Sequence, residues 1–474
     1  MVASAKTKWW GLSLLLLVQF MVVLDIAIVN VALPSIEVDL GFSRENLQWV
    51  ISAYALVFGG FLLLGGRAGD LLGRRRLFLA GLGVFTLGSL AAGLAWSDTA
   101  LIGARAVQGL GAAIITPAAL AILTTMFAEG RERNIALGAW GAVGAFGAVA
   151  GVLAGGVLTD ALSWEWIFFV NIPVGIAAIA FTPVLLAESH DRRAKSFDVL
   201  GAVLVTSGLS TLVYAITEAP DYGWTSLPTI GLFAAVVTLL GAFVAVEHRV
   251  SDPLMPLSIF RVRAVAGANV AGFILGTALF GMFLMLTLYM QLVLGYSPMR
   301  TGFAYLAVAG TAIVWANVSA IIVTRVGVKP VLGLGMTLMT VALVYFAQVS
   351  PGGSYVGDLL PGFLILAIGM GFSFVPITIA GMAGVADSQA GLASGLINTS
   401  QQIGGALGIA VLSAVATSAT TDSLVSGASQ PQALVDGFQT AFWVAAAVAF
   451  AGVVATLALI RGEEIVAAPA LEAA

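Results

Sequence analysis

Residues 21–34 read MVVLDIAIVNVALP and lie inside a long apolar run whose single charge is on Asp25. The run extends from Trp10 to Leu33, which is twenty-four residues. A helix of that length crosses the hydrocarbon core of a bilayer. A carboxylate near the middle of such a helix costs roughly 2.5–3.5 kcal/mol on insertion scales. Asp25 is therefore expected to have either a partner or a functional role.

The composition identifies the environment of the whole chain. Hydrophobic residues make up 60% of the 474 residues and charged residues 9%, whereas soluble proteins carry about 25% charged residues. The chain is predicted to be an all-α polytopic membrane protein. It has no cysteine, which excludes disulfides and thiolate metal sites, and only two histidines. No catalytic cluster is visible, so neither an enzyme nor a metal site is expected.

Fourteen apolar stretches, each about 20 residues long and so long enough to span a bilayer, are separated by polar breaks. Each is predicted to be a transmembrane helix, and an even number places both termini on the same side. The first stretch is too long for the core of a signal peptide, so it is expected to remain on the protein. The stretches start near Trp10, Leu47, Leu77, Ala100, Ile135, Trp166, Val199, Leu227, Ala264, Gly302, Val328, Leu359, Gly391 and Phe438.

The basic residues indicate which side is cytoplasmic, because Lys and Arg are enriched in cytoplasmic loops. Seventeen of the twenty Lys and Arg residues fall in the terminal segments or in alternate loops. The opposite loops hold only Arg44 and Arg300, together with many acids. Both termini are therefore predicted to be cytoplasmic. The basic segments of the predicted cytoplasmic loops are 67–76, 131–133, 192–195, 249–263 and 325–329.

A weak internal repeat suggests two related halves. Residues 70–83, DLLGRRRLFLAGLG, align loosely with residues 324–335, TRVGVKPVLGLG, and each combines a glycine, basic residues and a new apolar helix. Parallel repeats of this kind form transporters with a substrate site between the halves. The predicted organisation is a six-helix half at 1–187, a linker with transmembrane helices 7 and 8 at 188–260, a six-helix half at 261–460 and a cytoplasmic tail at 461–474.

Arg105 is the charge whose depth suits Asp25. It is the only charged residue of the fourth stretch, and it lies about 7.5 Å inside the outer end of that helix, against about 12 Å for Asp25 in the first. Unpaired burial of either charge is costly, so an ion pair or a shared aqueous cavity is expected. Asp25 and Arg105 are the candidate proton-coupling residues. The alternative is a static ion pair that joins two helices.

Further candidates line a predicted substrate cavity or a helix contact. Gln108 and Thr116 share helical spacing with Arg105, which predicts a polar stripe along a cavity. Aromatic side chains of the second half offer an adaptable apolar surface, although packing is their more common role. Small residues four positions apart allow two helix backbones to approach closely. The second-half cavity candidates are Tyr289, Tyr305 and Trp315, and the close-packing candidates of the fifth stretch are Gly147, Gly151 and Gly155.

The loop after the second stretch reads GRAGDLLGRRR at 66–76. The positive-inside rule alone explains its basic residues as an anchor. Its spacing adds that Asp70 and Arg74 are four residues apart and that Gly69 and Gly73 permit a tight turn. A carboxylate here is also suited to cap a neighbouring helix. Gly66, Asp70, Gly73 and Arg74 are the candidate gating residues.

Four stretches together resemble the major facilitator superfamily, in particular its fourteen-helix drug:proton antiporter branch of the multidrug efflux type. LDIAIVNVALP at 24–34 resembles the first-helix motif of that branch with its embedded acid, and the 66–76 loop resembles the loop signature of the superfamily. RAVQGLGAA at 105–113 is similar to the fourth-helix motif, whose arginine is implicated in proton coupling. WEWIFFVNIPVG at 164–175 is similar to the stretch that opens helix 6. The likeness covers nearly the whole chain.

This resemblance implies the major facilitator fold, with two six-helix bundles and two inserted helices. It implies proton-coupled export of hydrophobic, amphipathic or cationic small molecules, such as drugs, antibiotics and dyes, across a bacterial cell membrane. Asp25 would carry the proton, and moving Arg105 away or admitting water would change its proton occupancy. The energy source would be the proton gradient, with no cofactor, no nucleic-acid partner and a monomer as the working unit.

The chain differs from the branch in two features, and two other functions are alternatives to drug export. The fifth-helix motif usually carries a proline after glycine, but GAFGAVAGVLAGG at 144–156 has none. The second-half stretches carry no embedded acid, which makes multiply charged cations less expected substrates. A proton-coupled or facilitative transporter of a specific metabolite would use the same fold. A non-transporting membrane sensor is less expected, because the loops are short.

Overall fold

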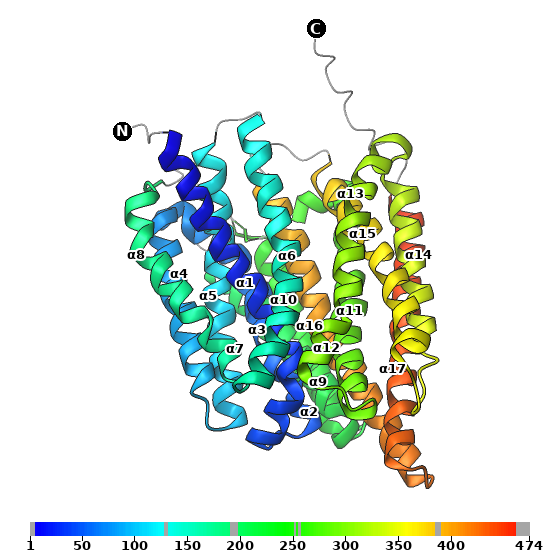
Figure 1. Cartoon of the computed structure of the whole chain (residues 1–474). Helices are drawn as coiled ribbons and strands as arrows, with labels where there is room; N and C mark the ends of the chain where they lie inside the picture. The colour runs from blue at the N-terminus through cyan, green and yellow to red at the C-terminus, as the bar shows by residue number, and fades with distance from the viewer. Residues whose placement is uncertain are drawn as a thin grey trace.

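The computed structural model describes residues 5–127, 131–189, 198–250, 253–254, 257–383 and 390–460. All regular secondary structure in these ranges is helical, as predicted. Helix α1 begins and helix α17 ends at the same end of the bundle (Figure 1). The first helices are α1 (Ala5–Leu40), α2 (Arg44–Leu47), α3 (Trp49–Leu72), α4 (Arg74–Gly93), α5 (Asp98–Met126), α6 (Arg131–Ala161), α7 (Trp166–Phe169) and α8 (Asn171–Leu185).

Two helices follow and then a second series. Helices α9 (Val199–Tyr222) and α10 (Leu227–Glu247) connect the two series. The second series is η1 (Leu257–Arg261), α11 (Arg263–Leu288), η2 (Tyr289–Val293), α12 (Pro298–Ala304), α13 (Leu306–Val326), α14 (Val328–Phe346), η3 (Tyr355–Leu359), α15 (Leu360–Met382), α16 (Ala390–Val425) and α17 (Gln430–Leu459).

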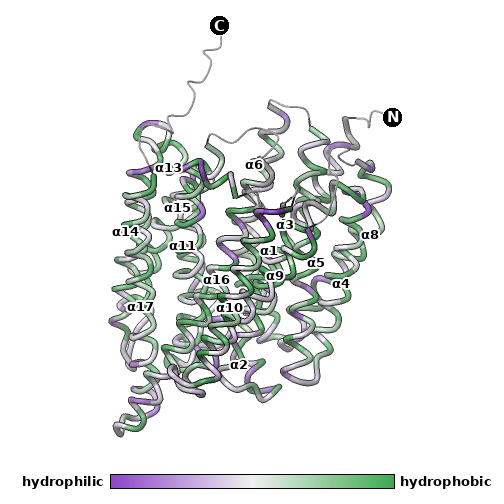
Figure 2. Tube along the Cα trace, turned by 180° about the vertical axis from the view of Figure 1, so that it is seen from behind, coloured by the Kyte–Doolittle hydropathy of each residue, from purple (hydrophilic) through white to green (hydrophobic). Residues whose placement is uncertain are grey.

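The membrane-spanning character of the helices agrees with the composition. Twelve helical segments of the described chain are long and apolar enough to cross a membrane. In α3 and α6 the described apolar parts are shorter, Trp49–Leu62 and Ala150–Ala161, so the predicted count of fourteen stays a prediction. Hydrophobic residues follow most of the length of the helices, with hydrophilic residues concentrated toward their ends (Figure 2). The protein is a multi-pass membrane protein.

Several helix ends follow from local sequence. Ser97, Ser226 and Ser297 each accept a hydrogen bond from a backbone N–H in the first turn of α5, α10 and α12, respectively, as N-cap residues do. The last helix begins at Gln430, eight residues before the predicted start at Phe438. The reason is that residues 430–437 are too polar to be assigned to an apolar stretch from hydropathy. They nevertheless continue the helix beyond its apolar part.

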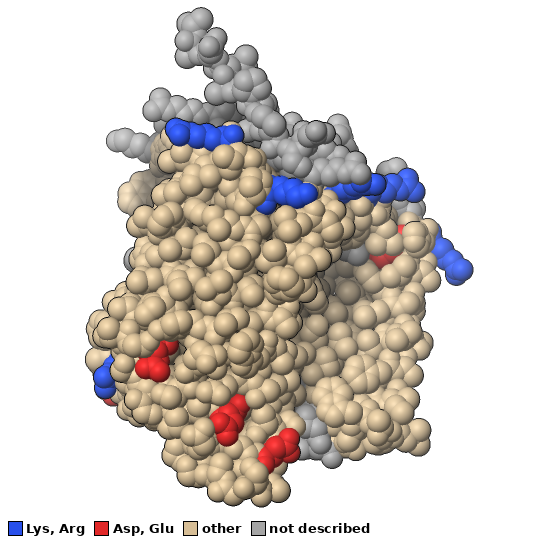
Figure 3. Space-filling model, turned by 90° about the vertical axis from the view of Figure 1, so that its right-hand side faces the viewer, with Lys and Arg blue, Asp and Glu red and all other residues tan. Residues whose placement is uncertain are grey.

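The charges lie at opposite ends of the bundle. On the face seen in Figure 3, Lys and Arg gather along the end at which the termini lie, and Asp and Glu are concentrated toward the other end. This distribution agrees with the alternation of basic and acidic loops in the sequence. The basic end is called the inner end below and the acidic end the outer end.

The helices pack as two groups with α9 and α10 beside them (Figure 1). In the first group α1 packs on α6 and α8, and α5 packs on α3 and α4. In the second group α11 packs on α16 and α17, and α14 packs on α15 and α17. Helix α9 contacts both α3 and α16, so it touches both groups. The predicted boundaries at residues 187, 260 and 460 are not tested by these contacts and stay predictions.

The glycines of α6 permit its close approach to α1. A Cβ at Gly151 would lie 2.7 Å from the carbonyl oxygen of Leu24, and one at Gly155 would lie 2.5 Å from that of Ile28. Gly147 approaches Val23 and Phe20 one turn earlier. Gly147, Gly151 and Gly155 thus lie on the face of α6 that approaches α1, and the missing proline does not prevent this contact.

The second group repeats this arrangement. A Cβ at Gly404 would overlap the carbonyl oxygen of Phe273, and one at Gly408 would overlap that of Thr277, so α16 approaches α11 as α6 approaches α1. The turns before α4 and α14 also correspond, because Gly73 and Gly327 have φ values of +104° and +84°. Only glycine adopts such a conformation readily.

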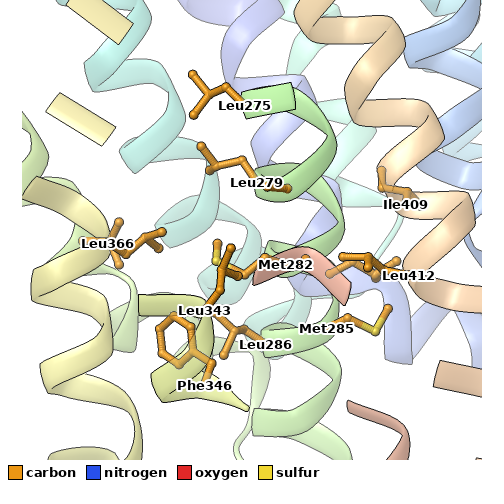
Figure 4. Packing of buried hydrophobic residues seen from close by; sticks show 14 of the residues in the cluster. Leu275, Leu279, Met282, Met285, Leu286, Leu343, Phe346, Leu366, Ile409 and Leu412 are labelled. Carbon is orange, nitrogen blue, oxygen red and sulfur yellow. The ribbon is translucent and has the colours of Figure 1, made fainter. Parts of the chain in front are cut away.

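The core of the second group consists of interlocking aliphatic side chains. Leu279, Met282 and Leu286 of α11 point toward Leu343 of α14 and Leu366 of α15 (Figure 4). All five are at most 2% exposed. Met282 thus serves packing in this structure, and its flexible thioether fills a gap between three helices.

Candidate functional site

Asp25 and Arg105 form a buried ion pair. Arg105 Nη1 donates to Asp25 Oδ2 at 2.6 Å, and the two residues are 1% and 0% exposed, respectively. The pair joins the middle of α1 to α5 inside the first helix group. Of the two arrangements that the sequence left open, direct pairing is the one present.

Two amide side chains complete the shell of the carboxylate. Asp25 Oδ1 accepts from Asn171 Nδ2 at 2.7 Å and from Gln108 Nε2 at 3.1 Å. Both amide nitrogens also donate to Ser89 Oγ, at 3.0 and 2.9 Å, and Ser89 donates to the carbonyl of Phe168 at 2.9 Å. Asp25, Ser89, Gln108 and Asn171 are each at most 1% exposed. Helices α1, α4, α5 and α8 therefore meet at one desolvated carboxylate.

The guanidinium of Arg105 is held on its other sides by α3 and α7. Nε donates to the carbonyl of Val50 at 2.9 Å, and Nη1 donates to Gln108 Oε1 at 2.9 Å. The ring of Tyr54 lies 4.4 Å from Cζ and that of Phe168 5.7 Å from it, distances at which aromatic faces attract cations. These contacts offset part of the cost of burying the pair.

The sequence singled out Asp25 and Arg105 as a possible pair and Gln108 as a cavity residue. It did not single out the other polar members of this cluster. Gln108 was placed on a cavity wall, whereas it hydrogen-bonds to the ion pair and is fully buried. Asn171 lies in the stretch quoted at 164–175, but its amide is one of many neutral polar groups in the helices. Ser89 and Tyr54 carried no signal, because only tertiary packing brings α4 and α3 to Asp25.

The predicted cavity residues are not brought together. Thr116 is partly buried, and its hydroxyl has no hydrogen bond among the described residues. Tyr289 is fully buried and donates to the carbonyl of Ser350, and Tyr305, 4% exposed, donates to that of Phe283. Trp315 packs edge-on against Phe372. Tyr289 and Tyr305 belong to the core of the second group rather than to a cavity, because their rings are buried there and their hydroxyls donate to backbone carbonyls.

The segment 66–76, predicted as a loop, is mostly helical: residues 66–72 end α3, Gly73 makes a tight turn and residues 74–76 begin α4. This corner docks on the segment after α8. Glu188 Oε1 and Oε2 accept from the backbone N–H groups of Arg75 and Arg76 at 3.0 and 3.2 Å, which caps α4. Arg74 N donates to the carbonyl of Ser189 at 2.8 Å. The capping carboxylate is thus Glu188, which the sequence did not single out.

The other candidate gating residues are placed only in part. The side chain of Asp70 lies outside the described part, so its predicted pairing with Arg74 stays a prediction. Arg74 Nη1 lies 3.5 Å from the carbonyl of Ala121 in α5. Gly66 lies beside Pro117 of the same helix. The segment therefore contacts the inner half of α5, the helix that carries Arg105 nearer its outer end.

The sequence model of the Major Facilitator Superfamily matches residues 15–409. The chain belongs to the Major Facilitator Superfamily. Members of this superfamily are transporters, so the protein is a membrane transporter and not an enzyme.

Named relatives of this major facilitator include antibiotic resistance and export proteins. The chain is 41% identical to the puromycin resistance protein pur8 of Streptomyces alboniger, over 93% of this chain and 88% of that one. It is 38% identical to the cephamycin export protein CmcT of Amycolatopsis lactamdurans, over 89% and 87% of the two chains. The crystal structure of the POT family transporter PepTSo is similar in fold, with a TM-score of 0.68 at 14% identity over 94% and 98%.

The two helix groups of this major facilitator touch at the outer end. Gln291 Nε2 donates to the carbonyl of Val31 at 2.9 Å, and Met299 N donates to Asp160 Oδ2 at 3.2 Å. A Cβ at Gly156 would lie 2.7 Å from the carbonyl oxygen of Pro298. α6 and α12 are therefore in close contact at that end of the bundle.

Proposed function

We propose that this major facilitator exports hydrophobic or amphipathic small molecules, including antibiotics and other drugs, in exchange for protons. The observation that carries the proposal is the buried cluster at Asp25, a titratable group held beside a cation in the membrane. Intramembrane ionisable residues mark ion and proton pathways. The names of the relatives support small-molecule export, since they are resistance and export proteins.

Protonation of Asp25 changes the balance of charge inside the first group. In the ionised state the pair with Arg105 is neutral overall and each charge offsets the other. A proton on Asp25 leaves Arg105 as an uncompensated buried cation, which is costly. The protonated state therefore favours a different packing around α5, and this links proton binding to a conformational change.

The conformational change is alternating access between the two helix groups. In the described arrangement the groups meet at the outer end, through Gln291 with Val31 and Met299 with Asp160. Opening toward the outside requires these contacts to part. The loop with Gly66, Asp70, Gly73 and Arg74 would then help to close the inner end. The substrate site lies between the groups, as in transporters with parallel repeats.

The arrangement in the cell follows from the same features. We infer fourteen transmembrane helices, with α3 and α6 added to the twelve segments that meet the length and hydropathy requirements. Both termini are cytoplasmic, because the basic end of the bundle faces inward. The protein works as a monomer in the cytoplasmic membrane of a bacterium. The proton gradient is its energy source, with no cofactor.

A transport assay with everted membrane vesicles tests the export function. A panel of antibiotics and dyes that includes puromycin is offered to vesicles with an acidic interior. We expect at least one compound to accumulate well above the level in vesicles without the protein, and a protonophore to abolish this difference. Equal accumulation with and without the protein for every compound would reject drug export. Accumulation that persists with the protonophore would reject proton coupling.

A further inference from the structure

The Asp25 carboxylate is surrounded by hydrogen-bond donors. Oδ2 accepts from Arg105, and Oδ1 accepts from Gln108 and Asn171. This arrangement suits the ionised form, which only accepts hydrogen bonds. The protonated form carries an O–H group that must donate, and none of these three contacts offers it an acceptor. Leaving that group unpaired in a buried site would be unfavourable, because a buried donor without an acceptor has lost its hydrogen bonds to water.

Gln108 is not the amide that can turn to supply the acceptor. Its Oε1 already accepts from Arg105 Nη1 at 2.9 Å. Turning the amide would bring its NH2 group against the guanidinium, so two groups that only donate would face each other. The orientation of Gln108 is therefore fixed as long as Arg105 stays in place.

Asn171 is free of that constraint. Both of its hydrogen bonds use Nδ2, to Asp25 at 2.7 Å and to Ser89 at 3.0 Å. Its Oδ1 makes no hydrogen bond within the described part of the chain. A half-turn of the amide would place Oδ1 toward Asp25. The Ser89 hydroxyl, which now donates to the carbonyl of Phe168, could then rotate to donate to the same Oδ1.

We propose that Asn171 is the positioning residue for the protonated state of Asp25. Its amide donates to the ionised carboxylate and turns to accept the O–H of the neutral carboxyl. The turn draws Ser89 away from Phe168, so proton binding loosens the contact between α4 and α7. This inference rests on the proposed function, in which Asp25 takes up the coupled proton.

Isotope-edited infrared spectroscopy tests the turn in the wild-type protein. The full chain is reconstituted in lipid vesicles with carbon-13 in the side-chain carbonyls of asparagine, and the pH is lowered stepwise. We expect a protonated-carboxyl band to appear and one asparagine carbonyl band to move to lower wavenumber with the same midpoint. Both changes should be absent in Asp25→Asn, which keeps the shape of the side chain.

Two further variants identify the asparagine. In Asn171→Leu the asparagine movement should be lost, and the carboxyl band should shift to higher wavenumber because its O–H has no acceptor. The matched control is Asn269→Leu, a buried amide of α11 that donates to the carbonyl of Val265 and accepts from Ser400. It should retain both changes.

The possible results separate the inference from the proposed function. An Asp25-dependent carboxyl band without any moving asparagine band would overturn the role of Asn171 and leave Asp25 as the proton site. The absence of an Asp25-dependent band over the whole titration would overturn both. The comparison of wild type with Asp25→Asn decides these cases even if Asn171→Leu does not fold.

Discussion

At the scale of single residues, the neighbours of Asp25 explain how a charge is tolerated in the middle of a membrane helix. Its oxygens accept from Arg105, Gln108 and Asn171, and hydrogen bonds to charged groups contribute about 1.5–3 kcal/mol each. Their sum is comparable with the several kcal/mol that desolvation of the carboxylate costs. The site is thus stable while ionised and sensitive to any change in the charge of Asp25.

Substitution of Arg105 separates structural from functional roles. Arg105→Ala removes one partner of a buried pair, so we expect a loss of about 3–5 kcal/mol in stability and a lower yield from the membrane. Arg105→Lys keeps the charge but not the fork that reaches Val50 and Gln108 together. We expect near-normal yield and roughly tenfold slower proton-driven transport, the effect of losing about 1.4 kcal/mol in a hydrogen bond to a charged group.

Thermal unfolding in detergent and initial transport rates in vesicles measure the two effects. Wild-type transport by Arg105→Lys would contradict a role for the guanidinium geometry. Wild-type stability of Arg105→Ala would contradict the buried ion pair itself.

The sequence predicts the charged members of this site better than the neutral ones. Asp25 and Arg105 are each the only charge of an apolar stretch, and the cost of burying either one alone points to the other. Asn171 and Ser89 are neutral, and a neutral polar residue in a helix has many ways to satisfy its hydrogen bonds. Tyr289 and Tyr305 were cavity candidates because of their aromatic character, with packing as the more common role, and in this structure both side chains lie in the core of the second group.

At the scale of helices, the α1–α6 contact depends on the absence of side chains on one face of α6. We expect Gly155→Ala to lower stability by about 1–3 kcal/mol, as overpacking does, because the new Cβ would lie 2.5 Å from the carbonyl oxygen of Ile28. The control is Gly103→Ala in α5, where a Cβ meets nothing within 4 Å. It should be neutral or stabilising by up to about 1 kcal/mol.

Thermal unfolding of both glycine variants in the same detergent makes the comparison. Equal unfolding temperatures for Gly155→Ala and wild type would show that α6 does not approach α1 this closely. The four-residue glycine spacing made this contact predictable, whereas the partner helix became known only from the fold.

The cap that Glu188 provides for α4 gives a second prediction at this scale. Glu188→Gln removes the charge that faces Arg75, Arg76 and the start of α4. We expect a loss of about 0.5–2 kcal/mol, the usual range for a helix cap. Spin labels on the inner ends of the two helix groups should report a changed distance distribution. Glu132→Gln, an exposed acid near the start of α6, is the control.

An unchanged distance distribution in Glu188→Gln would leave the 66–76 loop as an anchor without a gating role. The sequence predicted the turn in this loop from its glycines but not the acceptor, because Glu188 lies more than one hundred residues further along the chain.

At the scale of the whole molecule, the separation of charge predicts the orientation in the membrane. The chain has no cysteine, so single cysteines report their side directly. Arg76→Cys, at a side chain 79% exposed at the inner end, should react only after the membrane is permeabilised. Val38→Cys, at a residue 85% exposed at the outer end, should react with an impermeant reagent in intact cells. The opposite pattern would reverse the proposed topology.

The fold as a whole was predictable to a large degree. Long apolar stretches give helices, and the glycine turns at Gly73 and Gly327 mark equivalent points of the two halves. The count of fourteen spanning helices stays a prediction, because the described apolar parts of α3 and α6 are limited to Trp49–Leu62 and Ala150–Ala161. How α9 packs on both α3 and α16 was not readable at all, because it depends on contacts between distant segments.

The most direct test of the account compares two modes of transport in Asp25→Asn. The variant is reconstituted beside the wild type and assayed with the best-transported compound of the panel. We expect normal protein yield and retained exchange of labelled compound across the membrane without a gradient, because the amide preserves the shape of the site. Accumulation driven by an imposed pH difference should be lost, since an amide does not titrate in this range. Accumulation at the wild-type level in Asp25→Asn vesicles would contradict the assignment of Asp25 as the proton carrier.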